Sequence, residues 1–196
     1  MSRFKPLRIA VTGGIGSGKS AALGMLKKMG HKVLSADGIY RKLLLTDQGM
    51  RNEIRSVFGC AVFHKNGRLD RSRLAKVVFA DPAMRRKLNG ITHPKIENII
   101  SGTAKGSGGH VFVEVPLLYE EKLENRYDMV LLITAKKNIR IKRLRKRGLS
   151  PGMIKKRIES QLGEDRKAAL ADRVIENNKT IGDLKKSLES FVGRLR

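Results

Sequence analysis

Residues 13–20 read Gly-Gly-Ile-Gly-Ser-Gly-Lys-Ser, and no other stretch constrains the fold of this chain as strongly. The run matches the pattern of a phosphate-binding loop (P-loop), G-x-x-x-x-G-K-[ST], at every fixed position. An apolar, β-branched segment at 7–12 precedes it, and apolar residues at helical spacing follow over 19–29. In such a loop the backbone N–H groups converge on phosphate oxygens beside a helix N-terminus. The sequence therefore predicts the opening strand, loop and helix of a parallel α/β sheet.

Further apolar runs predict the rest of this sheet. They are short and rich in Val, Ile and Leu, as is typical of parallel strands buried on both faces, and they lie at 32–35, 111–115, 129–133 and 173–175. The region between the second and third runs carries helical patterns instead, at 38–45, 50–58, 71–79 and 82–100, with a short extended piece near 61–64. The glycine-rich stretch 102–109 is expected to be a flexible connection that leads back to the sheet.

The last third of the chain predicts three helices. A very basic helix covers 137–147, a second begins at Pro151 after a Ser150 cap and runs to 167, and an amphipathic one covers 181–195. We therefore expect an α/β fold of about five parallel strands flanked by helices. Its nucleotide-binding core would comprise 1–36, 110–136 and 168–196, with a helical acceptor-binding insertion at 37–109 and a small helical lid at 137–167.

Composition narrows the classes of function. The chain has 196 residues, and 40% of them are hydrophobic, which suffices for one packed core. Its single cysteine, Cys60, fits a reducing compartment and is expected to be a small buried residue. No apolar run approaches the roughly 20 residues of a membrane span, and the start of the chain lacks a signal-peptide pattern. We therefore expect a cytoplasmic protein without a membrane partner.

The net charge of +24 would attract any polyanion, so nucleic acid is a conceivable partner. The cations are spread along the chain, however, and aromatic residues, which would stack on bases, make up only 5%. A basic surface around a highly phosphorylated ligand is therefore favoured over nucleic-acid binding as the function.

Within the P-loop, Lys19 should reach the β- and γ-phosphates and the Ser20 hydroxyl should coordinate Mg²⁺. Switch proteins, motors and small-molecule kinases all share this motif. A compact chain with one helical insertion favours a kinase.

Asp37, just beyond the second strand, could accept the proton of an acceptor hydroxyl, but an Asp before a helix is equally well explained as an N-cap. Arg140, Arg143 and Arg147 share one helix face, where guanidinium groups could stabilise phosphoryl charge, although a solvated basic face explains any single one of them.

Beyond these motifs, the whole chain resembles the dephospho-CoA kinase family. The matching residues include Thr12–Ser20, the Ala36-Asp37 pair, Gly67–Arg71, His93-Pro94, Val115–Glu120, Arg143-Leu144 with Arg147, Gln161, Ala171-Asp172 and Asn177. The resemblance implies a P-loop kinase fold, with ATP and Mg²⁺, that phosphorylates the ribose 3′-hydroxyl of dephospho-CoA to give CoA and ADP. Ser35 replaces an acid that is usual in the family, while the second acid, Asp37, is retained.

The resemblance also implies roles for individual residues. Asp37, Lys19 and Arg143 would be catalytic. The ATP-binding residues would be Gly14, Ile15, Gly16, Ser17, Gly18, Lys19, Ser20, Ala21, Arg147 and Asn177. The acceptor would be bound by Asp37, Arg71, His93, Pro116, Leu117, Leu118 and Glu120.

Two other functions remain open: a P-loop kinase for a nucleotide or sugar acid, and a P-loop protein whose basic surface binds nucleic acid. The oligomeric state is not predicted.

Overall fold

A computed structural model describes residues 5–195 of the chain, which forms two compact units. One unit runs up to Ser35 and resumes at Thr103, and the other spans Ala36–Gly102. Each unit has its own hydrophobic core. The P-loop belongs to the first unit.

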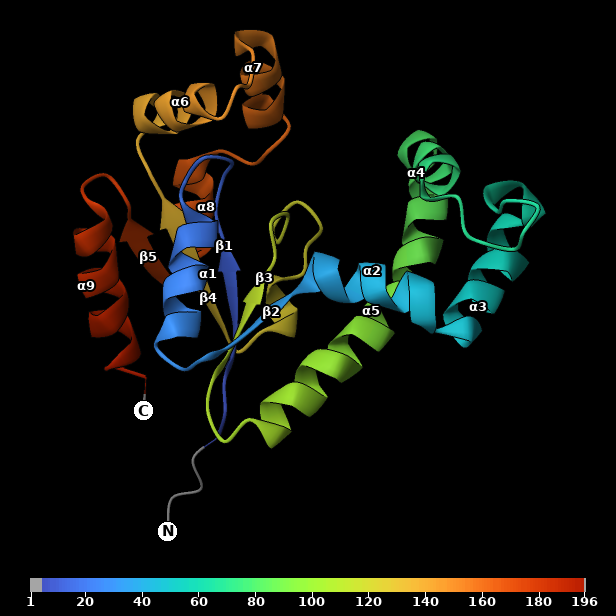
Figure 1. Ribbon diagram of the computed structural model, residues 1–196, viewed down its shortest axis with the longest axis horizontal. Helices are drawn as coiled ribbons and strands as arrows, with labels where there is room; N and C mark the ends of the chain where they lie inside the picture. Colours follow the sequence, from blue (N-terminus) through green and yellow to red (C-terminus); the bar gives the residue numbers. More distant parts are fainter. Residues whose placement is uncertain (1–4, 196) are drawn as a thin grey trace. The chain divides into compact units, whose positions relative to one another are not determined.

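The first unit is built on five parallel strands, as the apolar runs predicted (Figure 1). Their order across the sheet is β2-β3-β1-β4-β5, with β1 in the middle. The strands are β1 (Arg8–Thr12), β2 (Lys32–Ser35), β3 (Val111–Glu114), β4 (Met129–Thr134) and β5 (Arg173–Glu176). Because all five run in the same direction, the loops after β1, β3 and β4 leave the sheet at one edge.

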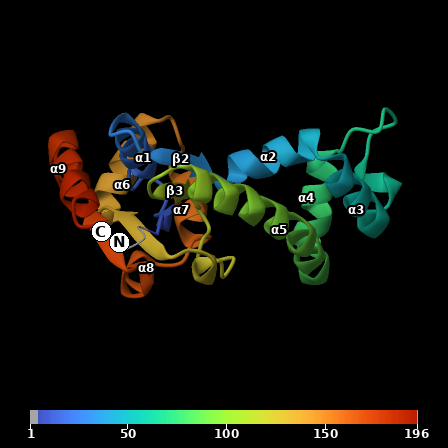
Figure 2. The same ribbon diagram turned by 90° about the horizontal axis from the view of Figure 1, so that it is seen from below.

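Helices cover both faces of the sheet. Helix α1 (Lys19–Lys28) packs with α9 (Ile181–Val192), and both bury side chains with those of β1 and β4 in one core. Helix α8 (Glu164–Leu170) contacts β4, and Figure 2 shows it on the side away from α1. Helices α6 (Lys137–Lys146) and α7 (Pro151–Glu159) lie beyond the carboxyl ends of the strands in Figure 1. A short 3-10 turn, η2 (Glu124–Arg126), precedes β4.

The predicted continuous helix from Pro151 to Lys167 is wrong. Helix α7 ends at Glu159 and α8 begins at Glu164, because Gly163 adopts an extended backbone conformation, with φ −57° and ψ 145°. The residues between the two helices are thereby freed to bond to other parts of the chain, as described below.

The second unit is helical. It contains α2 (Ala36–Thr46), α3 (Gln48–Phe58), the 3-10 turn η1 (Cys60–Val62), α4 (Arg71–Ala80) and most of α5 (Pro82–Gly106). The Asp47 side chain caps α3 by accepting a hydrogen bond from Met50, and Asp70 caps α4 in the same way. The apolar faces of these helices meet in a core that includes Leu44, Met50, Ile54, Val62, Phe63 and Leu74.

Three details of this region differ from the prediction. Helix α5 continues to Gly106, so much of the glycine-rich return is helical. The extended piece is reduced to a single antiparallel bridge between Phe63 and Leu69, next to η1. Cys60 is exposed and not buried, because η1 directs Val62 rather than Cys60 into the core.

Within the described residues, no helix has the length and apolar character needed to cross a membrane.

An ion pair at the start of β1 makes the stability of the sheet dependent on pH. Asp128, just before β4, accepts hydrogen bonds from the Arg8 backbone N–H at 2.8 Å and from the Arg8 Nε at 3.1 Å. Burial alone would raise the pKa of the Asp128 carboxyl, but the bonds from Arg8 outweigh burial and the net pKa is lowered.

We predict that Asp128→Asn loses stability at neutral pH but little at low pH. A carboxyl with a depressed folded-state pKa stabilises the fold above its unfolded-state pKa, and this contribution is lost as pH falls through the folded value. Urea unfolding at pH 7 and pH 3 measures the difference. Asp165→Asn, at an exposed position in the first turn of α8, is the control. An equal loss for Asp128→Asn at both pH values would contradict the assignment.

Candidate functional site

The P-loop follows β1 and leads directly into α1, and two of its glycines are required by close contacts. Gly13 has φ 153°, and a Cβ built there would lie 2.1 Å from the Ile133 carbonyl oxygen at the end of β4. Gly18 has φ 98°, and a Cβ there would lie 2.1 Å from the Asn177 Nδ2. Any other residue at either position would clash and strain the backbone. Glycine therefore lets the loop pass between β4 and the segment after β5.

A carboxylate that sequence reasoning missed lies beside the P-loop lysine. The Glu114 Oε1 is 3.7 Å from the Lys19 Nζ, and neither side chain is more than 27% exposed. Glu114 is the last residue of β3, the strand paired with β1, so its carboxylate reaches the edge of the sheet where the P-loop begins. A polar residue ending a buried parallel strand was the available signal for it.

Hydroxyl groups of the P-loop and of the strand before it could supply further oxygen ligands. Among the described residues, Thr12 Oγ1 and Ser17 Oγ are buried without a partner. Ser20, the first-turn hydroxyl of α1, is exposed. No three His, Cys, Asp or Glu side chains gather as a metal site within residues 5–195. Hydroxyl and carboxylate oxygens next to a P-loop fit Mg²⁺, which typically takes few protein ligands and completes its shell with phosphate and water.

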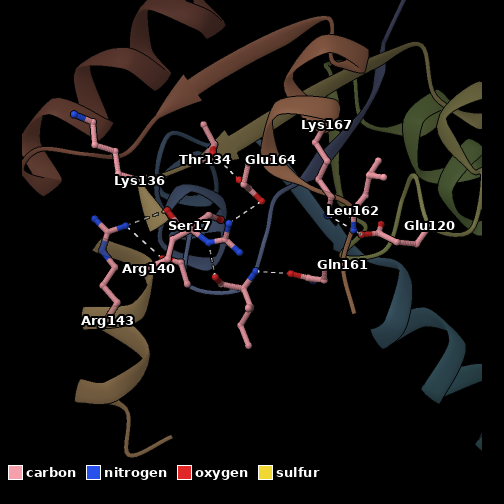
Figure 3. Close-up of polar contacts among 12 residues, drawn as sticks. Ser17, Glu120, Thr134, Lys136, Arg140, Arg143, Gln161, Leu162, Glu164 and Lys167 are labelled. Atoms are coloured by element: carbon pink, nitrogen blue, oxygen red, sulfur yellow. Dashed lines mark hydrogen bonds and ion pairs between the residues drawn. The ribbon is translucent and has the colours of Figure 1, made fainter. Parts of the chain in front are cut away.

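Arg140 of α6 is buried against the P-loop. Its Nε donates to the Ile15 carbonyl oxygen at 2.9 Å, and its NH1 lies 3.1 Å from the Glu164 Oε1 (Figure 3). The Thr134 hydroxyl also donates to Glu164. The Arg140 side chain is only 5% exposed, so a solvated basic face is the wrong interpretation for this arginine. Its charge is paired with Glu164 and helps to hold the loop.

Arg143, one turn further along α6, binds the other end of the loop. Its NH1 donates to the Ser17 carbonyl oxygen at 3.2 Å, and its NH2 donates to the Asn177 carbonyl oxygen at 2.9 Å. Asn177 in turn donates from its Nδ2 to the Ser17 carbonyl oxygen at 2.9 Å. The structure thus brings Arg143, assigned from sequence as catalytic, together with Asn177 and the P-loop, which were assigned to the ATP site.

A further contact to the P-loop comes from the break between α7 and α8. The Ile15 N–H donates to the Gln161 Oε1 at 2.9 Å, and the neighbouring Leu162 N–H donates to the Glu120 Oε1 at 2.9 Å. Glu120 also forms an ion pair with Lys167, whose Nζ lies 2.8 Å from the same oxygen.

The environment of Glu120 keeps its carboxyl ionised at neutral pH. Burial raises the pKa of this carboxyl, but the nearby Lys167 and the Leu162 N–H outweigh burial and lower it. The Lys167 side chain is fully buried, so the pair is shielded from solvent. Nothing in the local sequence signals these contacts, since they join residues 42 and 47 positions apart.

Other residues assigned from sequence also lie in the first unit. Arg147 is the exposed residue that ends α6. Ala21 lies on the exposed side of the first turn of α1. In the loop after β3, Leu118 is fully buried while Leu117 is 43% exposed, so the two leucines of the Pro116–Glu120 segment face different surroundings.

Asp37, Arg71 and His93 belong to the second unit, on α2, α4 and α5. Asp37 is exposed and lies inside the first turn of α2, which begins at Ala36, so it is not the residue before the helix that the cap interpretation required. Arg71 follows the Asp70 cap and lies close enough to Tyr40 to oppose the rise that burial causes in the Tyr40 pKa. His93 is partly buried within α5.

Comparison with known proteins identifies relatives along nearly the whole chain. The family model for dephospho-CoA kinase matches residues 7–183. A dephospho-CoA kinase from Corynebacterium glutamicum is 34% identical over 194 residues, covering 96% of this chain and 100% of the relative. One from Fusobacterium nucleatum is 36% identical over 185 residues, covering 93% and 95%.

Two solved structures superimpose on nearly the whole chain. A protein from Thermus thermophilus superimposes with a TM-score of 0.81 at 32% identity, covering 98% of this chain and 100% of that one. The dephospho-CoA kinase from Campylobacter jejuni superimposes with a TM-score of 0.67 at 27% identity, covering 96% of each chain. The fold, the P-loop and these matches lead to one conclusion: the chain belongs to the dephospho-CoA kinase family.

Proposed function

We propose that this protein transfers the γ-phosphoryl group of ATP to the ribose 3′-hydroxyl of dephospho-CoA, giving CoA and ADP, the last step of coenzyme A biosynthesis. The observation that carries this proposal is the P-loop, set between β1 and α1, in a chain whose family match spans residues 7–183. The reaction would take place in the cytoplasm, where a lone exposed thiol such as Cys60 stays reduced.

The triphosphate would bind along the P-loop. Gly14, Ile15, Gly16, Ser17 and Gly18 would supply backbone N–H groups, and the N-terminus of α1 would add positive potential. Lys19 would neutralise the β- and γ-phosphates, and Arg143, which already holds the loop, would stabilise charge on the transferring group. Ala21, Arg147 and Asn177 would complete the nucleotide site.

Mg²⁺ would be held by the Ser20 hydroxyl and by the phosphates, and Glu114 would bind one of its waters. The partly buried Glu114 beside Lys19 supports this assignment. Bound there, the ion would neutralise charge that develops on the phosphoryl oxygens. Full turnover in the presence of a chelator would contradict it.

The acceptor would be bound by Arg71 and His93 and by the loop Pro116–Glu120, to which Leu117 contributes an exposed apolar side chain. Asp37 would accept the proton of the 3′-hydroxyl. The hydroxyl oxygen forms a bond to the γ-phosphorus as the bond from that phosphorus to the β–γ bridging oxygen breaks, and ADP leaves.

An acceptor panel tests the substrate assignment. We expect ADP release in a coupled assay with dephospho-CoA, and little with nucleoside monophosphates or gluconate, because the chain belongs to the dephospho-CoA kinase family. Turnover confined to another acceptor would overturn the proposal. Tight duplex DNA binding at physiological salt, without kinase activity, would instead support the nucleic-acid alternative.

We predict that Asp37→Asn folds and binds ATP but slows phosphoryl transfer by roughly 10²-fold or more, the scale of a general-base contribution. The measurement is kcat with saturating dephospho-CoA, and the melting temperature checks the fold. Glu53→Gln, on α3 of the same unit, is the matched control and should keep near-normal turnover. Near-normal turnover of Asp37→Asn would remove Asp37 from the chemistry.

A further inference from the structure

The hydrogen bond between Ile15 and Gln161 occupies a donor that the triphosphate would also use. The Ile15 N–H donates to the Gln161 Oε1 at 2.9 Å. A backbone N–H carries one hydrogen and forms one strong bond at a time. The Gln161 side chain therefore stands where a phosphate oxygen would be bound, and the nucleotide must replace it at Ile15.

The residue next to Gln161 is tied to the loop that follows β3. The Leu162 N–H donates to the Glu120 Oε1 at 2.9 Å, and Glu120 is paired with the fully buried Lys167 (Figure 3). Two consecutive residues, Gln161 and Leu162, thus connect the P-loop to the Pro116–Glu120 loop. They can do so because the chain is not helical between α7 and α8.

The two ends of this connection differ in strength. The Gln161 end is a single bond between neutral groups, which is readily exchanged for a charged phosphate oxygen. The Glu120 end is a buried ion pair with an added backbone bond, so it resists disruption. Glu120 also has one buried oxygen, Oε2, for which no partner is found among the described residues.

We propose that Gln161 is a positioning residue that couples the nucleotide site to the acceptor site. With both sites empty it holds the Ile15 N–H. When dephospho-CoA engages the Pro116–Glu120 loop, the shift of Glu120 moves Leu162 and draws Gln161 off the P-loop, which frees Ile15 for phosphate. Each substrate then tightens the binding of the other. This inference rests on the proposed function, which assigns the Pro116–Glu120 loop to the acceptor.

Calorimetric titration with the non-hydrolysable analogue β,γ-imido-ATP and Mg²⁺, with and without dephospho-CoA, tests the coupling. We expect dephospho-CoA to tighten analogue binding to the wild type by about fivefold or more, the lower end of usual coupling between sites. Gln161→Met keeps the length of the side chain but removes its amide. In this variant the ratio of analogue affinities with and without dephospho-CoA should fall to about one. The analogue alone should bind to that variant roughly five- to tenfold tighter, because no bond to Ile15 must first be broken.

Two further variants sharpen the test. Gln161→Glu keeps an oxygen for Ile15 but adds a negative charge beside the phosphates, so it should bind the analogue more weakly than the wild type. Ser160→Ala is the matched control, since the Ser160 hydroxyl donates to the Arg157 carbonyl of the preceding helix, and it should behave as the wild type. Melting temperatures verify that each variant is folded.

Wild-type coupling retained in Gln161→Met would overturn the inference, and so would a wild type that binds both ligands independently. Direct titration of dephospho-CoA separates this failure from that of the proposed function. A wild type that does not bind dephospho-CoA contradicts the function and the coupling together, whereas binding without coupling contradicts only the role of Gln161.

Discussion

The conformation of the P-loop backbone is the constraint on which the rest of the structure depends. The loop must present N–H groups to phosphate at the tip of the sheet, so carbonyl oxygens on its other side need donors from elsewhere in the chain. Arg140 and Arg143 donate to the carbonyls of Ile15 and Ser17, and Asn177 adds a second donor to Ser17. The parallel order that places β3 and β4 on either side of β1 brings these groups to one edge.

This arrangement explains the presence of some of the many basic residues. Arg140 is neutralised by Glu164, and Arg143 is engaged by backbone oxygens. A guanidinium suits this task because its five donors lie in a fixed plane and its charge is never lost. The same cations that fix the loop leave a positive potential where a triphosphate would bind. For the remaining charge on α6 and α7, such as Lys155, the structure offers no specific partner beyond i,i+4 pairing with Glu159.

Periodicity and motif identified the five strands, the P-loop and most helices, because each of these is a local pattern. The errors arise where distant residues decide the local structure. The break at Gly163 is accompanied by a hydrogen bond from the Leu162 N–H to Glu120. Arg140 is buried because it forms an ion pair with Glu164 and donates a hydrogen bond to the Ile15 carbonyl oxygen. Glu114 beside Lys19 could have been found from its place at a strand end, whereas no local signal links Gln161 to Ile15.

The central claim is that the P-loop amides and the Lys19 ammonium together hold the triphosphate of Mg·ATP. Calorimetric titration of Mg·ATP into the wild type and Lys19→Met tests it most directly, since it needs no acceptor. The account predicts saturable heat with one site per chain for the wild type, and affinity at least tenfold weaker for Lys19→Met at unchanged melting temperature. Absence of heat with the wild type, or equal affinity for both proteins, would contradict it.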